Sequence, residues 1–216
     1  MKRKIILSVL VILLCAVGVW SWLAKPWEGW LADEQPDTET TIDRFDRLLD
    51  EYVSLGSYTA LHRMNTQYPT ETKLLIENVL ELGTVDEPDI EKRLRTYYLD
   101  STVQVLLDEV HRQYSDLSDL ELDFDHAFKE LKQKDPSFRV PHVYTQISCL
   151  NQSIVVGDTL IGISLDKYLG ADFPLYREYY SEEQRQQMNR SAIVSDAVSA
   201  YLQYGKLNDH PFSNPR

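Results

Sequence analysis

Cysteine is scarce in this chain, which has two cysteines among its 216 residues. Cys15 lies in an apolar N-terminal run and Cys149 stands alone in the rest of the sequence, so no disulfide framework can staple the domain. The hydrophobic core must therefore hold the fold by itself. Cys149 lies in the alternating segment VYTQISCL, a setting typical of a buried structural thiol rather than of a nucleophile.

Positive charge is also sparse, with 22 Lys and Arg against 34 Asp and Glu and a net charge of −12. Lys2, Arg3 and Lys4 lie together at the N-terminus, and no further cluster of basic residues follows. So acidic a surface repels nucleic-acid phosphates. The composition therefore argues against nucleic acid as a partner.

The common catalytic motifs are missing as well. The sequence has no nucleophile elbow, P-loop, dinucleotide fingerprint or CxxC pair. The acidic stretch at 116–128, DLSDLELDFDHAF, lacks the glycine and the final glutamate of an EF-hand loop and fits a solvated helix face instead. No two histidines stand one helical turn apart, and we expect no metal site and no cofactor. The histidines are His62, His111, His126, His142 and His210.

One long hydrophobic run is present, at residues 5–23, and it contains no charged residue. As a helix its 19 residues would span roughly 28 Å, close to the hydrocarbon thickness of a bilayer. We predict that residues 1–24 form a membrane anchor or signal segment, with residues 25–40 as a linker and 41–210 as a single extracytoplasmic domain. An uncleaved anchor, lipidation at Cys15 and a signal cleaved after Gly18 remain alternatives. All three place the domain in the cell envelope, anchored in the inner membrane facing the periplasm or held by lipid.

The periodicity of the domain predicts an α+β fold, rich in helix, with a small sheet near 142–165. Gly157–Asp158 separates two β-branched runs, which is a strong hairpin signal for 153–166, and 142–150 alternates as a half-buried strand should. Ser181 and Gln184 have the spacing of a capping box. Helices are predicted from Thr41 to a stop at Gly56, at 58–67, 70–82, 88–114 and 119–133, from Ser181, and from Ser191 to a stop at Gly205.

The segment IVSDAVSAYLQYG, residues 193–205, raises the question of a metal site. Ser195 and Ser199 stand one helical turn apart, with Asp196 between them, as the histidines and glutamate of a His-Glu-x-x-His zinc helix do. Serine hydroxyls are neutral, short ligands that hold zinc poorly. The apolar residues of the segment already explain it as a packing helix.

The block at 141–180 resembles the gliding-motility-associated lipoprotein B family of the Bacteroidetes. That resemblance implies a cell-envelope protein and, in gliding bacteria, a part of the motility apparatus. Because the two zinc-binding histidines are absent, we expect a non-enzymatic protein of this kind that acts through protein partners. The family is in turn distantly similar to zincin-type metallopeptidases, so Ser195, Asp196 and Ser199 would be vestigial motif positions of a degenerate zincin-like fold. The alternative is a divergent zincin-like metallopeptidase or hydrolase. The matching residues are Val143, Tyr144, Thr145, Ile147, Ser148, Asn151, Ile161, 163–166, Tyr168, Leu169, Gly170, Tyr176 and 204–206.

Aromatic residues gather after the predicted hairpin. One hypothesis is that Phe173, Tyr176, Tyr179 and Tyr180 edge a surface that binds a partner. The alternative is that these rings cover the junction between helix and sheet. Their burial in the folded protein distinguishes the two.

Overall fold

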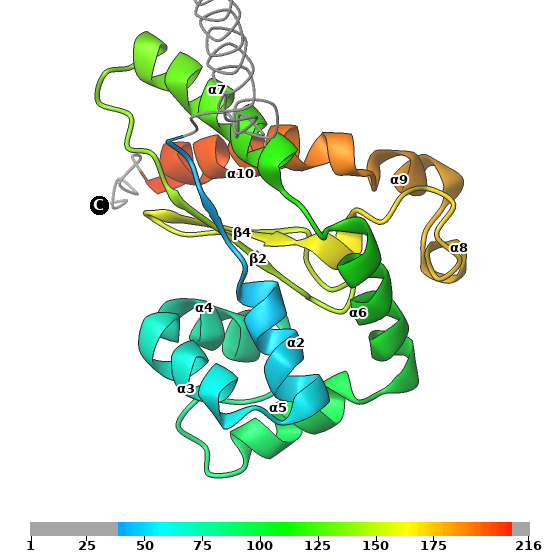
Figure 1. Ribbon diagram of the computed structural model, residues 1–216. Coiled ribbons are helices and arrows are strands. Elements are labelled where there is room, and N and C mark those ends of the chain that lie inside the picture. The colour runs from blue at the N-terminus through cyan, green and yellow to red at the C-terminus, as the bar shows by residue number, and fades with distance from the viewer. Residues whose placement is uncertain (1–38, 209–216) are drawn as a thin grey trace, which may run out of the picture. The chain divides into compact units, whose positions relative to one another are not determined.

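The computed structural model describes residues 39–208 (Figure 1). The predicted membrane segment at 1–24, its Cys15, and the linker up to residue 38 lie outside the described residues. Within residues 39–208 no helix has both the length and the apolar character needed to cross a bilayer.

The described residues form one sheet of four strands in the order β1–β2–β4–β3. The predicted hairpin is confirmed, because β3 pairs antiparallel with β4. β2 runs parallel to both β1 and β4, which the sequence did not indicate. The strands are β1 (Ile42–Asp43), β2 (His142–Gln146), β3 (Ile154–Val156) and β4 (Leu160–Ser164).

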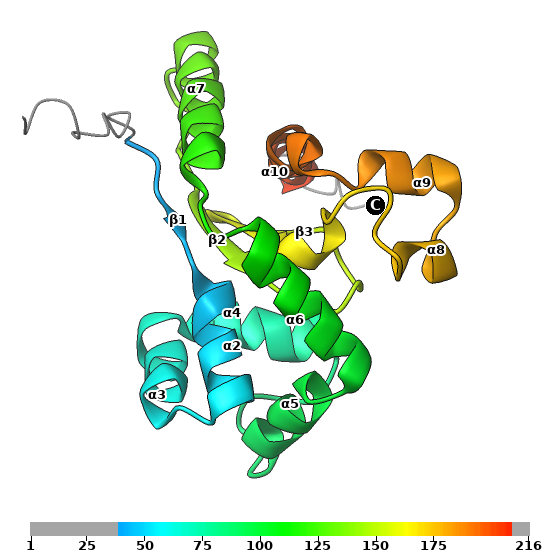
Figure 2. The ribbon, with the colours of Figure 1, turned by 45° about the vertical axis from the view of Figure 1, so that its right-hand side comes forward.

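Helices cover both faces of this sheet, with α10 and α7 on one side and α2 to α5 on the other (Figures 1 and 2). In chain order the helices are α2 (Phe45–Leu55), α3 (Tyr58–Gln67), α4 (Pro69–Lys73), the π-helix η2 (Leu74–Val79), α5 (Ile90–Tyr98), α6 (Ser101–Gln113), α7 (Ser118–Lys134), the 3₁₀ helix η3 (Leu165–Lys167), α8 (Tyr176–Tyr179), α9 (Glu182–Gln187), the 3₁₀ helix η4 (Arg190–Ala192) and α10 (Ile193–Asn208).

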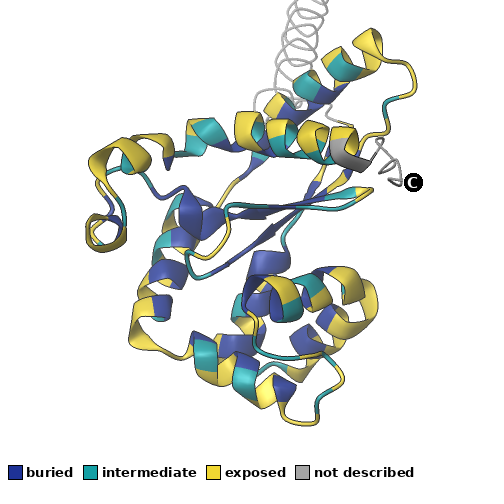
Figure 3. Ribbon diagram, turned by 180° about the vertical axis from the view of Figure 1, so that it is seen from behind, coloured by how far each residue is buried: buried dark blue, intermediate teal, exposed yellow. Residues whose placement is uncertain are grey.

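The strand predicted at 142–150 was expected to be half-buried, and this prediction is wrong, because helices pack on both faces of the sheet. All four residues from Val143 to Gln146 are buried, and the strand ends at Gln146 (Figure 3). Burial on both faces is typical of strands in parallel sheets. The alternation in the sequence therefore reflected side-chain chemistry, not solvent exposure.

The first helix begins later than predicted. Ile42 and Asp43 form β1 beside Val143 and Tyr144, and α2 starts only at Phe45. The backbone N–H of Ile42 donates to the Glu121 carboxylate at 3.0 Å, so a partner from α7 holds this segment extended. The predicted stop is confirmed, because Gly56 ends α2 in the left-handed conformation at a φ of 69°.

Three other helix predictions need correction. The segment 88–114 is two helices, because Asp100 caps the start of α6 by accepting the N–H of Thr102 at 2.8 Å. The segment 70–82 changes from α4 to the π-helix η2 at Leu74 and ends at Val79. α10 continues through Gly205 to Asn208. The predicted capping box of α9 is confirmed, with both of its hydrogen bonds present.

The core lies between the sheet and these helices, and it is rich in large aromatic rings. Its largest fully buried side chains are Tyr98, Tyr114, Tyr144, Tyr176, Phe45 and Phe124. A buried tyrosine needs a partner for its hydroxyl group. The hydrogen-bond partners of these hydroxyl groups therefore show how the backbone at 141–180, the segment that resembles the lipoprotein family, is held in place.

Candidate functional site

The loop after β2 has an unusual backbone. Cys149 and Leu150 both have positive φ angles, of 55° and 68°. Non-glycine residues rarely adopt this region, and such conformations persist only where the surrounding structure holds them. This loop therefore requires support from other parts of the chain.

Asp166 provides that support. One carboxylate oxygen accepts the N–H of Ser148 at 2.8 Å and the other accepts the N–H of Leu150 at 2.6 Å. No pattern in the sequence connects Asp166 to this loop, because the two segments are joined only across the sheet. The carboxylate is fully buried, and that burial raises its pKa although the two N–H groups act in the opposite direction. Asp166 is thus a buried structural residue that supports the loop, and a substrate in solvent cannot reach it.

Buried tyrosine hydroxyls hold the same segment. Tyr114 donates to the carbonyl of Tyr168, and Tyr176 donates to the carbonyl of Asp166, each at 2.6 Å. Tyr176 also accepts the N–H of Leu169 at 2.9 Å. Burial raises the pKa of Tyr114 and of Tyr176, so both hydroxyls remain protonated donors. These tyrosines anchor the backbone rather than offer a proton to a ligand.

The three positions singled out on α10 lie on its exposed side. The Ser195 hydroxyl donates to the carbonyl of Ala192 in η4, directly before α10, at 2.9 Å. Asp196 accepts a hydrogen bond from the Tyr168 hydroxyl at 3.0 Å. Ser199 is exposed. The other face of α10, with Ile193 and Ala197 fully buried, packs toward the sheet.

The histidines are spread over the molecule. His62 and His126 are exposed, and His210 lies outside the described residues. His142 Nε2 lies 3.6 Å from an Asp43 carboxylate oxygen and 3.7 Å from one of Glu71, at the edge of the sheet. Within residues 39–208 no group of three or more His, Cys, Asp or Glu residues is placed to hold a metal ion.

The four aromatic residues after the hairpin do not form one surface. Phe173 and Tyr176 are buried in the core, the second because its hydroxyl is engaged by the backbone at residues 166–169. Tyr180 is half-buried, and its hydroxyl and ring both contact the Lys167 ammonium group. Tyr179 alone of the four is exposed, at 61%. The expected partner-binding edge is thereby reduced to Tyr179 and part of Tyr180.

Cys149 lies in the loop after β2 and has a free thiol. It is half-buried, and burial raises its pKa, with the Asp166 charge acting in the same direction. A thiol in this state is a poor nucleophile because the thiolate is scarce. Its surroundings agree with the structural role predicted from the sequence.

The family model described as "Gliding motility protein GldB" matches residues 31–213. The chain belongs to this family. The match confirms the resemblance and covers every described residue. No curated protein and no solved structure matches the chain. The GldB family is one of gliding-motility lipoproteins, and membership places the chain in the cell envelope.

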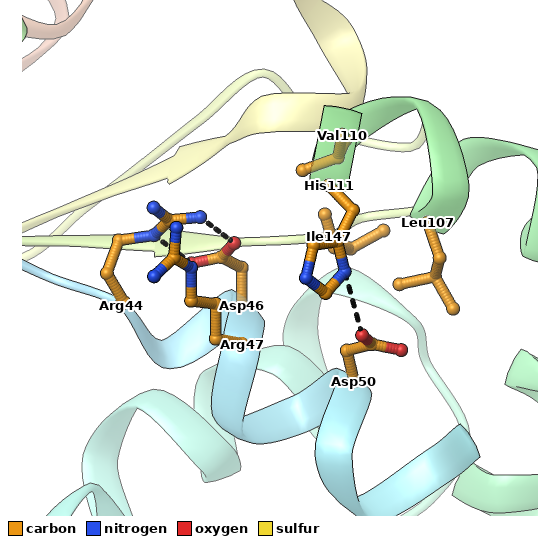
Figure 4. A pocket seen from close by; sticks show the side chains of 8 residues that line it. All are labelled: Arg44, Asp46, Arg47, Asp50, Leu107, Val110, His111 and Ile147. Carbon is orange, nitrogen blue, oxygen red and sulfur yellow. Dashed lines mark hydrogen bonds and ion pairs between the residues drawn. The ribbon is translucent and has the colours of Figure 1, made fainter. Parts of the chain in front are cut away.

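A small pocket of this GldB-family chain lies between the start of α2 and the end of α6 (Figure 4). It is small, and its charged side chains bond to one another or to the backbone. Arg44 donates twice to the Asp46 carboxylate, at 2.8 and 2.7 Å, and His111 Nδ1 lies 3.2 Å from Asp50. Arg47 donates to the carbonyl of Ser115. These pairs join α2 to α6 and the loop after it, and leave little polar capacity for a ligand.

Two larger hollows lie elsewhere on the domain. A polar cleft of about 640 Å³ runs between the end of η2 and the loop that holds Asn151. Asn151 belongs to the family-like segment and donates to the carbonyl of Val79 at 3.1 Å, which ties the loop to the π-helix. A second groove of about 820 Å³ lies between α2, α3 and α5 and has apolar side chains exposed at its rim. Sequence reasoning missed this groove, although Tyr58 and Leu99 are large apolar residues outside the helical stripes.

Proposed function

We propose that this chain is a non-enzymatic envelope protein that acts through protein partners in the gliding-motility setting of its family. One observation carries the proposal. Asp166 and Tyr176, two polar residues of the segment at 141–180 that resembles the family, are fully buried and hydrogen-bonded to the backbone. Such residues build a rigid scaffold on which outer surfaces are displayed. A reaction centre would instead need polar groups that converge on an open cleft.

The exposed face of α10 also supports the proposal of a non-enzymatic protein. Metal-assisted hydrolysis needs ligands that hold the ion and a carboxylate that activates water. Ser195 and Ser199 are weak ligands, and Asp196 already accepts the hydroxyl of Tyr168. The competing function is a divergent zincin-like metallopeptidase. The observation in its favour is that α10 packs against β3 and β4, so the helix follows and contacts the hairpin as a zincin helix would.

The mode of attachment is a second part of the proposal. We propose that residues 1–24 hold the domain at the inner membrane facing the periplasm, or that a lipid on Cys15 anchors it in the envelope. Mass spectrometry of the chain isolated from its native envelope distinguishes these outcomes. A retained, unmodified N-terminus indicates an anchor, and an acylated Cys15 at a new N-terminus indicates a lipoprotein. A mature chain that begins after Gly18 without lipid would contradict both.

The enzymatic alternative is tested on the purified full chain. We expect no peptide hydrolysis that depends on Asp196 after zinc is supplied, and unchanged crosslinking to envelope proteins in an Asp196→Asn variant. The control variant is Asp172→Asn, which changes an exposed carboxylate far from α10 in sequence. Stoichiometric zinc that is lost on Ser195→Ala, or hydrolysis that is lost on Asp196→Asn, would overturn the proposal.

A further inference from the structure

The groove between α2, α3 and α5 combines an apolar rim with a buried floor. Tyr58, at the start of α3, is 85% exposed, and Leu99, directly after α5, is 52% exposed; both line the groove. Leu61 and Tyr52 line it and are buried. Large side chains that stay in water beside a hollow are typical of binding surfaces, because the contact removes their apolar area from solvent.

Arg95 supplies a cation inside this groove. Its Nε donates to the carbonyl of Val53 at 3.3 Å, at the C-terminal end of α2. The guanidinium group lies over Gly56, where an added Cβ would come within 3.1 Å of Nη2. Gly56 is thus needed both for its positive φ angle and for the space that the guanidinium occupies.

Within residues 39–208 the terminal nitrogens of Arg95 donate no hydrogen bond, since only its Nε does so. Glu91 stands one turn earlier on α5, yet among residues 39–208 Arg95 has no ion pair with it or with any other carboxylate. Arg95 and Lys92 against Glu91 give the lining one net positive charge, on a chain whose net charge is −12. A guanidinium beside exposed apolar surface is suited to bind a carboxylate through two parallel hydrogen bonds.

We propose that this groove binds a segment of a partner protein in which an aliphatic or aromatic side chain stands next to a glutamate or aspartate. The apolar side chain lies between Tyr58 and Leu99, and the carboxylate pairs with Arg95. Charge complementarity argues for this occupant over a basic or neutral segment. The inference deepens the proposed function and rests on it for the premise that the chain acts through protein partners.

The test uses fluorescence anisotropy on the full chain, with two labelled, blocked peptides: acetyl-Leu-Glu-Phe amide and its counterpart with glutamine in place of glutamate. We expect the glutamate peptide to bind about fivefold more tightly, from one bidentate pair at a partly exposed site. Arg95→Gln should abolish that preference, while Tyr58→Ser and Leu99→Ser should weaken both peptides alike. These residues are exposed, so the variants should remain folded.

Two control variants show whether the peptides bind at the groove and not elsewhere on the domain. Arg63→Gln removes an exposed arginine of α3 that bonds Gln67, outside the groove lining, and Val105→Ser removes an exposed apolar residue of α6 that is also outside the lining. Both should bind like the unchanged chain. Equal affinity for the two peptides, or a preference that survives Arg95→Gln, would overturn the inference, and so would self-association through this face that excludes both peptides. If crosslinking to envelope proteins persists in those cases, the groove assignment fails and the proposed function stands.

Discussion

Arg190 forms a bidentate ion pair with Asp119, with its Nε 2.8 Å from one carboxylate oxygen and its Nη2 2.5 Å from the other. The same guanidinium donates to the carbonyls of Gln113 and Asp116 and lies over the ring of Tyr114, 4.8 Å from the centroid. These contacts join the turn before α10 to the start of α7. Residues some 70 positions apart are thereby held together by one side chain.

Replacing Arg190 with glutamine should therefore destabilise the domain. Glutamine cannot reproduce the fork of donors, and it leaves two carbonyls and a carboxylate without their partner. We expect a loss of about 1–3 kcal/mol in the free energy of unfolding. Urea denaturation followed by circular dichroism measures it. The matched control is Arg177→Gln, whose exposed pair with Asp172 should contribute less than about 0.5 kcal/mol. Equal effects of the two changes would contradict this role of Arg190.

The same ion pair predicts a dependence of stability on pH. The hydrogen bond from Arg190 holds the pKa of Asp119 below its ordinary value of 3.8. An acid whose pKa is depressed by folding stabilises the native state above its unfolded pKa, and that contribution is lost as the pH falls through the folded pKa. The difference in unfolding free energy between the unchanged chain and Arg190→Gln should therefore be constant from neutral pH to about pH 5 and shrink below about pH 3.8. Denaturation series at several pH values test this, and a difference that grows in acid would refute it.

Gly162 should tolerate no side chain. It pairs with Tyr144 across the parallel strands, and a Cβ there would lie 2.5 Å from the Tyr144 ring and hydroxyl. That ring is fully buried and packs edge-on against Phe45, so it has no room to move. Gly162→Ala should lower stability by about 1–3 kcal/mol. Gly205→Ala is the control, since an added Cβ there meets nothing within 4 Å and alanine favours the helix by about 0.5–1 kcal/mol. Thermal unfolding of both variants gives the comparison.

The Tyr144 hydroxyl itself has no hydrogen-bond partner within the described structure. An unsatisfied buried hydroxyl contributes nothing and costs desolvation, so Tyr144→Phe should leave stability unchanged or raise it by up to about 1 kcal/mol. Tyr176→Phe provides the contrast, because it removes two hydrogen bonds to the backbone and should cost about 1–3 kcal/mol. A large loss in Tyr144→Phe would show that the hydroxyl has a partner.

Asp166→Asn tests the two hydrogen bonds by which the Asp166 carboxylate supports the loop after β2. The amide nitrogen of asparagine would face the N–H of Ser148 or of Leu150, so one of these donors loses its acceptor. We expect a loss of about 1–3 kcal/mol, with faster hydrogen exchange at residues 148–152. Asp172→Asn, at an almost fully exposed carboxylate, should change neither quantity. Unchanged exchange in the loop would show that Asp166 does not support it.

Local features of the fold were readable from the sequence. Gly56 ends α2, Ser181 and Gln184 cap α9, and the hairpin turns at Gly157–Asp158, because each of these depends on residues a few positions apart. Asp100 was a readable signal that was missed, since a cap residue inside a long periodic segment marks a break. The assignment to an envelope family also came from the spacing of residues at 141–206.

Contacts between segments far apart in the chain could not be predicted from the sequence. Ile42 looked like the start of a helix, yet it pairs with a strand 101 positions later. Periodicity along the chain carries no information on that pairing. The same limit applies to the candidate site. Tyr176 and Tyr179 look alike in sequence, but the first hydroxyl is captured by the backbone of the adjoining turn and the second reaches solvent.

The sequence by itself determined the α+β composition, the family and the absence of histidine at positions 195 and 199, because these follow from residue identity and short-range spacing. Only the tertiary structure decided that Asp166 supports a loop across the sheet, that Arg190 ties the turn before α10 to α7, and that Arg95 lies without a carboxylate partner in a groove with exposed apolar residues. Burial and hydrogen-bond satisfaction are properties of segments brought together from far apart in the chain, and they exist only once the chain has folded.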